Sequence, residues 1–86
     1  MLRKEKEMTS FTEINYEVVE KVGVINKYPT GWTKELNIIA WNGGKPKLDI
    51  RDWDEDHEHM SRGITLHVNE AKVLSEKLME YINKSN

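Results

Sequence analysis

Three tryptophans lie within one basic stretch of this chain, residues 21–53. The stretch carries six lysines and arginines against three acidic residues, whereas the whole chain of 86 residues has a net charge of −2. Indole rings give the bases of a single strand flat surfaces for stacking, at about 1–3 kcal/mol per base. Basic side chains neutralise the phosphates. Because the charges are segregated along the chain, the net charge is a poor guide to the partner, and the stretch has the residue types of a surface that binds single-stranded nucleic acid.

The candidate contacts with a nucleic acid are of two kinds, base stacking and phosphate binding. Bases would stack on Trp41 and Trp53, and phosphates would be contacted by basic residues on or beside the same sheet face. We expect Asp49 to be a structural partner of a neighbouring arginine or backbone group. Trp32 stands at the start of its strand on the opposite parity, where it could turn outward or cover the edge of the core. The predicted DNA-binding residues are Trp32, Lys34, Trp41, Lys45, Lys47, Arg51, Trp53 and Arg62.

The same residue types admit other functions. Tryptophan and arginine are frequent hot spots of protein interfaces, so the aromatic face could instead dock a polypeptide or fill a dimer contact. Base stacking does not separate DNA from RNA either, and no residue is dedicated to a 2′-hydroxyl group. A protein-interaction or dimerisation module and a protein that binds single-stranded RNA therefore stay open as alternatives.

Other patterns indicate no catalytic or metal chemistry. The acidic segment 54–59 has metal-ligand residue types but no known ligand spacing and no glycine of a calcium loop, so we interpret it as a solvated acidic loop. No Gly-x-Ser-x-Gly context and no phosphate-binding loop is present. Without cysteine, the chain forms neither disulfides nor thiolate metal sites. We therefore predict no enzyme activity, no cofactor and no metal.

Four strands and one helix must position these residues. The strands are predicted over residues 15–26, 32–41, 47–53 and 62–67. Alternation in the first strand places on one face Tyr16, Val18, Val22 and Val24. The helix would run from an Asn69 cap to about Asn83, with Val68 and Val73 as a hydrophobic staple. Its apolar stripe consists of Leu74, Leu78, Tyr81 and Ile82. Short links favour an antiparallel meander, and the predicted fold is α+β, a four-stranded curved antiparallel sheet with a C-terminal helix covering one face.

The alternation of side chains between the two faces determines whether the loop between the two central strands has an odd or an even number of residues. Their apolar positions share one face only if the connecting loop has an odd number of residues. We predict a three-residue loop at residues 43–45. The resulting pairs would be Ile38 with Ile50, Ala40 with Leu48 and Trp41 with Lys47. The opposite face then collects Trp41, Arg51 and Trp53 and has no helix left to cover it, which indicates a partner.

The length and composition of the chain limit the architectures that it can form. A chain this short makes one small domain with a marginal core, so self-association is expected. We predict a mobile N-terminal tail over residues 1–13, one domain over residues 14–83 and a tail over residues 84–86. The sequence has no long apolar run and no hydrophobic N-terminal region, which predicts neither a membrane span nor a signal peptide. We expect a cytoplasmic, nucleoid-associated protein.

Two motifs, at a particular separation, resemble a known family. The segment KPKLDIRDW is followed by an acidic loop, by MSRGITL and by a capped amphipathic helix. Together these elements resemble the positive cofactor four family of transcriptional coactivators. The longer string GWTKELNIIAWNGGKPKLDIRDWDEDHEHMSRGITL is similar to the bacterial YdbC-like branch of that family. The resemblance covers the chain from Tyr16 to Ile82.

The resemblance implies a homodimer whose helices pack at the interface and whose outer sheet surfaces form channels for single-stranded DNA. Binding there would show little sequence preference and would serve transcription or genome maintenance. By position, the resemblance carries DNA-binding roles over to Trp41, Lys45, Arg51, Trp53 and Arg62. Coactivator members have a longer stretch between the arginine and the tryptophan, so the position of Trp53 differs from that of the tryptophan in those members. They also carry a serine-rich regulatory segment that this chain lacks, so regulation by phosphorylation is not implied.

Overall fold

The structure is a computed structural model, and it describes residues 15–85. Its elements in chain order are β2 (Tyr16–Lys27), β3 (Thr33–Trp41), β4 (Lys47–Trp53), β5 (Met60–Leu66) and the helix α1 (Val68–Lys84). The bounds of β4 match the prediction, and every other strand begins and ends within two residues of it. The tail predicted over residues 1–13 lies outside the described residues, so the domain limits stay a prediction.

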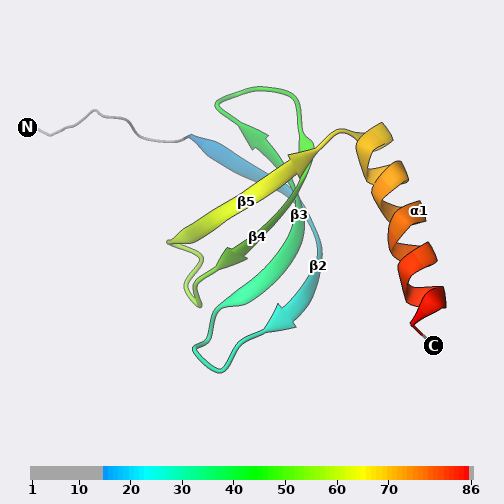
Figure 1. Ribbon diagram of the computed structural model, residues 1–86. Helices are drawn as coiled ribbons and strands as arrows, with labels where there is room; N and C mark the ends of the chain where they lie inside the picture. The colour runs from blue at the N-terminus through cyan, green and yellow to red at the C-terminus, as the bar shows by residue number, and fades with distance from the viewer. Residues whose placement is uncertain (1–14, 86) are drawn as a thin grey trace, which may run out of the picture.

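The four strands form one antiparallel sheet in the order in which they follow along the chain. Figure 1 shows that β2 and β3 bend along their length and that β5 runs obliquely across the view of the sheet. This arrangement confirms the predicted α+β fold, a meander followed by one C-terminal helix. We call the face that carries the odd-numbered residues of β3 and β4 the inner face, and the opposite face the outer face.

β2 departs from strict alternation at three points. Its register against β3 shifts between Val18 and Glu20, between Lys21 and Gly23, and between Val24 and Asn26. Such bulges bend a strand and increase its twist. Direct partners share a sheet face, so the pairs with β3 place on the inner face Tyr16, Val18, Lys21, Val24 and Lys27. The predicted alternation is therefore wrong for Val22, which stands at a bulge without a partner, and it missed both lysines.

The loop between β3 and β4 has the predicted parity but a different register. Ile38 pairs with Leu48 and not with Ile50, and the last pair of the ladder joins Ile39 to Lys47. The tight turn is centred on Asn42 and Gly43, both with positive φ, and the Gly44 N–H donates to the Trp41 carbonyl at 2.8 Å. Pro46 cannot donate a ladder hydrogen bond, which delays pairing until Lys47. All three predicted pairs are thus two residues out of register, while the apolar positions still share the outer face.

α1 begins before its predicted cap. The N-cap is His67, whose backbone N–H donates to the Glu70 carboxylate at 2.8 Å. Asn69 consequently lies inside the first turn, so the predicted Asn69 cap is wrong. The predicted staple is wrong as well, because Val68 and Val73 both lie within the helix. No helix among residues 15–85 is long and apolar enough to cross a membrane.

The prediction that α1 covers one face of the sheet is wrong. Within the described chain, α1 approaches only β4 and β5, and none of its residues is buried. Figure 1 shows the helix standing beside the sheet. One residue, His67, separates β5 from α1, which leaves the chain little length to turn back over the sheet. The apolar stripe of the helix is therefore exposed, with Leu78 and Ile82 about half accessible.

Candidate nucleic-acid interface

The inner face holds the most deeply buried side chains of the described chain. Ile39 and Trp53 are fully buried, and so are the polar side chains of Asn37 and Asp49, while Glu35 is 9% exposed. These residues alternate along β3 and β4, as the pleat of a strand requires. Because α1 lies away from this face, the curvature of the sheet and the residues of β2 and the acidic loop must provide the cover. The face predicted to be uncovered is therefore a partly enclosed surface.

Aromatic rings form a cluster on the inner face. The ring of Tyr16 lies 5.7 Å from that of Trp41 and 5.6 Å from that of Trp53, tilted against both. The imidazole of His57 stacks on Trp53 with centroids 4.1 Å apart and planes 3° from parallel. Trp41 and Tyr16 keep part of their surface accessible, whereas Trp53 is fully buried. Trp53 therefore presents no ring to solvent in this conformation, and its predicted role in DNA binding stays a prediction.

Arg51 is held within the same cluster. Its guanidinium lies over the Trp41 ring, 4.7 Å from the centroid, and donates to both carboxylate oxygens of Asp49 at 2.6 and 2.8 Å. Another of its N–H groups donates to the Ser61 carbonyl at 3.2 Å. The Asp49 side chain is fully buried and that of Arg51 is 13% exposed. The expected role of Asp49 as the partner of an arginine is confirmed, and the Arg51 charge is already compensated within the protein.

Gly63 in β5 leaves the space that the Arg51 side chain occupies. The two residues are direct partners in the ladder between β4 and β5. A side chain at Gly63 would overlap the Cβ of Arg51 and the carbonyl oxygen of Ile50. The glycine of the RGITL motif therefore leaves space on the inner face for the Arg51 side chain.

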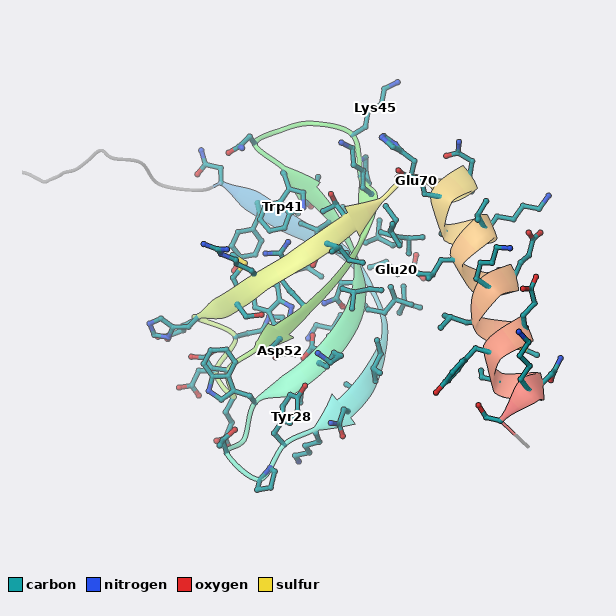
Figure 2. All side chains as sticks on the ribbon, viewed as in Figure 1. Glu20, Tyr28, Trp41, Lys45, Asp52 and Glu70 are labelled. Carbon is teal, nitrogen blue, oxygen red and sulfur yellow. The ribbon has the colours of Figure 1, made fainter. Side chains whose placement is uncertain are left out.

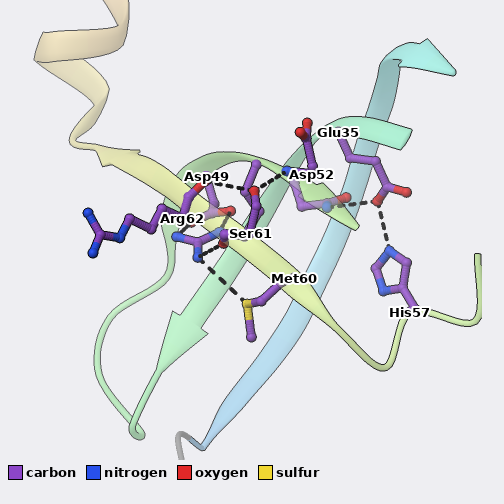
Figure 3. Close-up of polar contacts among 9 residues, drawn as sticks. Glu35, Asp49, Asp52, His57, Met60, Ser61 and Arg62 are labelled. Atoms are coloured by element: carbon purple, nitrogen blue, oxygen red, sulfur yellow. Dashed lines mark hydrogen bonds and ion pairs between the residues drawn. The ribbon is translucent and has the colours of Figure 1, made fainter. Parts of the chain in front are cut away.

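A second polar network ties the acidic loop to β3 (Figure 3). The Glu35 carboxylate accepts hydrogen bonds from Thr33 at 2.6 Å and Asn37 at 3.1 Å, and it lies 2.9 Å from Nε2 of His57. Burial by itself raises the pKa of the Glu35 carboxyl group, but the hydrogen bonds from Thr33, His57 and Asn37 outweigh it and hold the pKa below its usual value. Glu35 is thus a charged anchor that fixes the position of the His57 ring.

The acidic loop between β4 and β5 is folded around Asp54. One oxygen of this carboxylate accepts the backbone N–H groups of Glu58 and His59, at 2.8 and 3.0 Å, and the other lies 2.8 Å from Nδ1 of His59. The hydrogen bonds from His59 and Glu58 lower the pKa of the Asp54 carboxyl group. The same contact with Asp54 raises the pKa of His59. Among residues 15–85 no group of three or more His, Asp or Glu side chains is placed to hold a metal.

A separate cluster lies at the tip of the β2–β3 hairpin. Asp52 accepts a hydrogen bond from Tyr28 at 3.4 Å and one from Lys34 at 3.0 Å. This contact with Asp52 raises the pKa of the Lys34 ammonium group. Trp32 lines a shallow hollow together with Tyr28, Pro29, Thr30 and Asp52, and Figure 2 labels Tyr28 and Asp52 at this end of the molecule. Trp32 and Lys34 are therefore neighbours of each other and belong to a site apart from the inner-face cluster.

The remaining predicted cations surround the sheet. Lys45 lies exposed in the β3–β4 loop, and Lys47 pairs with Ile39 at the inner face. Arg62 is exposed and stands in β5 at the register shift beside Gly63, and in Figure 3 its side chain extends away from the polar network. Within residues 15–85, the basic side chains that form no ion pair include Lys21, Lys27, Lys45, Lys47 and Arg62.

Sequence reasoning missed three residues of this site. Lys21 and Lys27 reach the inner face because each bulge in β2 shifts the alternation by one position. A spacing of three between Val18, Lys21, Val24 and Lys27 was the available signal. His57 gave no comparable signal, since its place on Trp53 depends on a backbone with φ of +63° and on a contact with distant β3.

Comparison with known proteins places this arrangement in a family. Residues 28–77 match the sequence model of the family described as Transcriptional Coactivator p15 (PC4). The chain belongs to this family. The match confirms the resemblance found in the sequence, and its span runs from Tyr28, directly after β2, to Lys77 in α1. PC4-like proteins are a nucleic-acid-binding family known for binding single-stranded DNA, and the family is not enzymatic.

One curated relative agrees with a bacterial branch of the PC4 family. An uncharacterized protein of Treponema pallidum (strain Nichols) is 41% identical over 54 residues. The aligned part covers 63% of this chain and 64% of the relative, so the chain spans less than two thirds of the length of that protein.

Proposed function

We propose that this PC4-like chain binds single-stranded DNA with little sequence preference, as a homodimer. The observation that carries the proposal is the aromatic cluster on the inner face, where Tyr16 and Trp41 keep accessible ring surface beside the cations of β2 and the β3–β4 loop. Exposed rings stack bases of any sequence, and cations neutralise the backbone that follows them. The bases of a duplex are already stacked on each other, which favours a single strand.

The predicted contacts take different roles in this proposal. Trp41 and the partly exposed rings beside it stack bases, while Trp53 and Arg51 support them from beneath. Arg51 fixes the Trp41 ring through the cation–π contact at 4.7 Å, and its own charge is shared with Asp49. Phosphates are met by Lys45, Lys47 and Arg62, to which the bulges of β2 add Lys21 and Lys27. Trp32 and Lys34 form an outlying contact at the hairpin tip.

The homodimer is supported by exposed apolar side chains on the sheet and on α1. Side chains that a folded chain normally buries are about half exposed on β2, β5 and α1: Val19, Val22, Ile25, Ile64, Leu78 and Ile82. An apolar surface of this extent marks an interface, and a second copy of this chain would match it without any further partner. The inner face and its cations would then remain accessible on each subunit. We place the dimer in the cytoplasm with the nucleoid, where transcription, replication and repair open DNA strands.

Fluorescence anisotropy with labelled oligonucleotides tests the proposed function. We expect the chain to bind oligo-dT more tightly than a duplex of equal length, with an affinity that falls steeply as salt is added. Equal affinity for the duplex, or no binding to oligo-dT at low salt, would contradict single-strand recognition. Competition between oligo-dT and oligo-U decides between DNA and RNA as the preferred ligand.

A further inference from the structure

His57 is the side chain by which the acidic loop reaches the aromatic cluster. Its ring lies parallel to Trp53, within 3°, at a centroid distance of 4.1 Å. This is the arrangement that a nucleobase takes on an indole, with two flat rings in contact over their faces. The other large ring on Trp53, that of Tyr16, is tilted by 49°. His57 is therefore the member of the cluster that continues a parallel stack.

The position of the His57 ring is fixed before any ligand arrives. Nε2 lies 2.9 Å from Glu35, and the His57 backbone N–H donates to the Asp54 carbonyl at 3.0 Å. The loop around it is closed by the bonds that Asp54 accepts from Glu58 and His59. His57 also has a φ of +63°, which directs the side chain inward at a cost that the surrounding contacts must offset. A ring held in this way loses little entropy when another ring stacks on it.

The exposed surface of this stack belongs to His57. The Trp53 residue is fully buried, whereas the side chain of His57 is 28% exposed. Because Trp53 covers one face of the imidazole, the accessible part of the His57 side chain lies away from that face. We propose that His57 is a base-stacking residue, on whose outward face one base of a bound single strand lies, with Trp53 as the support beneath. This inference rests on the proposed function and adds to it a contact from the acidic loop.

The competing role is that of a plug. In that case His57 would occupy the place of a base on Trp53 and would have to leave when DNA binds. The closed loop and the Glu35 contact favour a fixed platform over a ring that swings out. The two roles predict opposite effects when the ring is removed, because a platform strengthens binding and a plug weakens it.

The test compares His57→Asn with His57→Phe by anisotropy on labelled oligo-dT. Asparagine tolerates a positive φ, so His57→Asn removes the ring while it respects the backbone. Phenylalanine keeps a flat ring and loses the hydrogen bond to Glu35. We expect His57→Asn to weaken binding by roughly five- to a hundredfold, as the loss of one stacked base implies, and His57→Phe to stay within about threefold of the wild type. His59→Asn is the matched control in the same loop, because the His59 ring is 76% exposed and stacks on nothing among the described residues.

Each alternative outcome overturns the assignment. Unchanged or tighter binding by His57→Asn excludes a platform, and tighter binding identifies a plug. Binding by His57→Phe as weak as by His57→Asn shows that the Glu35 contact matters and the ring does not. If the wild type binds oligo-dT and His57→Asn binds equally well, only this inference fails; if the wild type does not bind, the proposed function fails with it.

An NMR titration of the wild-type protein avoids any dependence on how the variants fold. On addition of oligo-dT we expect the ring protons of His57 to shift together with those of Trp41, while those of His59 stay in place. A titration that moves Trp41 and leaves the His57 ring unshifted would contradict the proposal.

Discussion

Gly63 lies directly opposite Arg51 in the ladder between β4 and β5, and its missing side chain leaves the space that the Arg51 side chain occupies. A Cβ at this position would overlap the Arg51 Cβ and the Ile50 carbonyl oxygen, and it would lie 2.9 Å from Nε of Arg51. Backbone atoms cannot give way as the end of a flexible side chain can. The packing of Arg51 against Asp49 and Trp41 thus depends on a glycine in the neighbouring strand.

Replacing this glycine should destabilise the fold. We expect Gly63→Ala to lower the free energy of unfolding by about 1–3 kcal/mol, the usual cost of forcing extra volume into a packed site, as measured by urea denaturation. Gly23→Ala is the matched control in a strand, because a Cβ there meets no other atom within 4 Å. Equal stabilities for the two variants would show that the contact at Gly63 relaxes freely.

The buried ion pair gives a second stability prediction. Asp49→Asn leaves the guanidinium of Arg51, only 13% exposed, without its counter-charge. We expect a loss of about 3–5 kcal/mol in the free energy of unfolding, which a small domain has difficulty surviving. Asp52→Asn removes a partly exposed pair with Lys34 at 3.0 Å and should lower the free energy of unfolding far less, because solvent screens such a pair. Similar losses for both variants would mean that the Asp49 pair is no stronger than a surface contact.

The sequence predicted what local pattern controls. The bounds of β4 followed from the residues of the strand itself, and Asp49 was expected to partner a neighbouring arginine or backbone group, as its pair with Arg51 confirms. The class of the fold followed from the order of the strands and the short links between them. These features need no information from distant parts of the chain.

Features that depend on distant contacts were not predictable. The bulges of β2 accompany the curvature of the sheet, and the spacing of three from Val18 to Lys27 indicates them only once the pairing with β3 is known. His57 turns inward because Trp53 and Glu35 receive it. Burial of Trp53 has the same origin, since the ring is covered by Tyr16 from the other end of the sheet. The sequence therefore identified the face that Trp41, Arg51 and Trp53 share, and misjudged how much of it is open.

The pair of Asp54 and His59 makes loop stability depend on pH. His59 has a pKa raised above its ordinary 6.5 by Asp54, so its contribution is complete below pH 6.5 and is lost as the pH rises through the raised value. Asp54 has a pKa lowered below 3.8 by bonds from His59 and Glu58, so its contribution is complete above pH 3.8 and is lost as the pH falls through the lowered value. The pair should therefore stabilise the loop most between pH 3.8 and 6.5.

Denaturation across this pH range measures the effect. We expect the difference in unfolding free energy between the wild type and His59→Asn to be largest near pH 5. It should shrink at alkaline pH, where the histidine of the wild type is as neutral as the asparagine of the variant. An NMR titration of the His59 ring provides the pKa directly. A His59 pKa at or below 6.5 would remove the basis of the prediction.

The exposed apolar stripe of α1 should control the oligomeric state. Leu78 is 49% exposed within the described chain, and it lies on the stripe that the proposed dimer would bury. We expect Leu78→Glu to shift the protein from dimer to monomer in sedimentation velocity and to lower its apparent stability, since dimerisation stabilises the fold by mass action. Glu76→Lys, on the opposite side of the helix, should leave the dimer intact. A wild type that sediments as a monomer at every concentration would refute the dimer.

Salt dependence should identify the lysines that meet phosphate. Lys47 lies on the inner face opposite Ile39 and forms no ion pair within residues 15–85. Because each phosphate contact releases counter-ions, Lys47→Gln should reduce the slope of log affinity against log salt by about 0.7 for oligo-dT, besides weakening binding at low salt. Lys77→Gln on α1 is the control and should leave the slope unchanged. If Lys47→Gln weakens binding without changing the slope, Lys47 supports the β3–β4 loop and does not contact the DNA backbone.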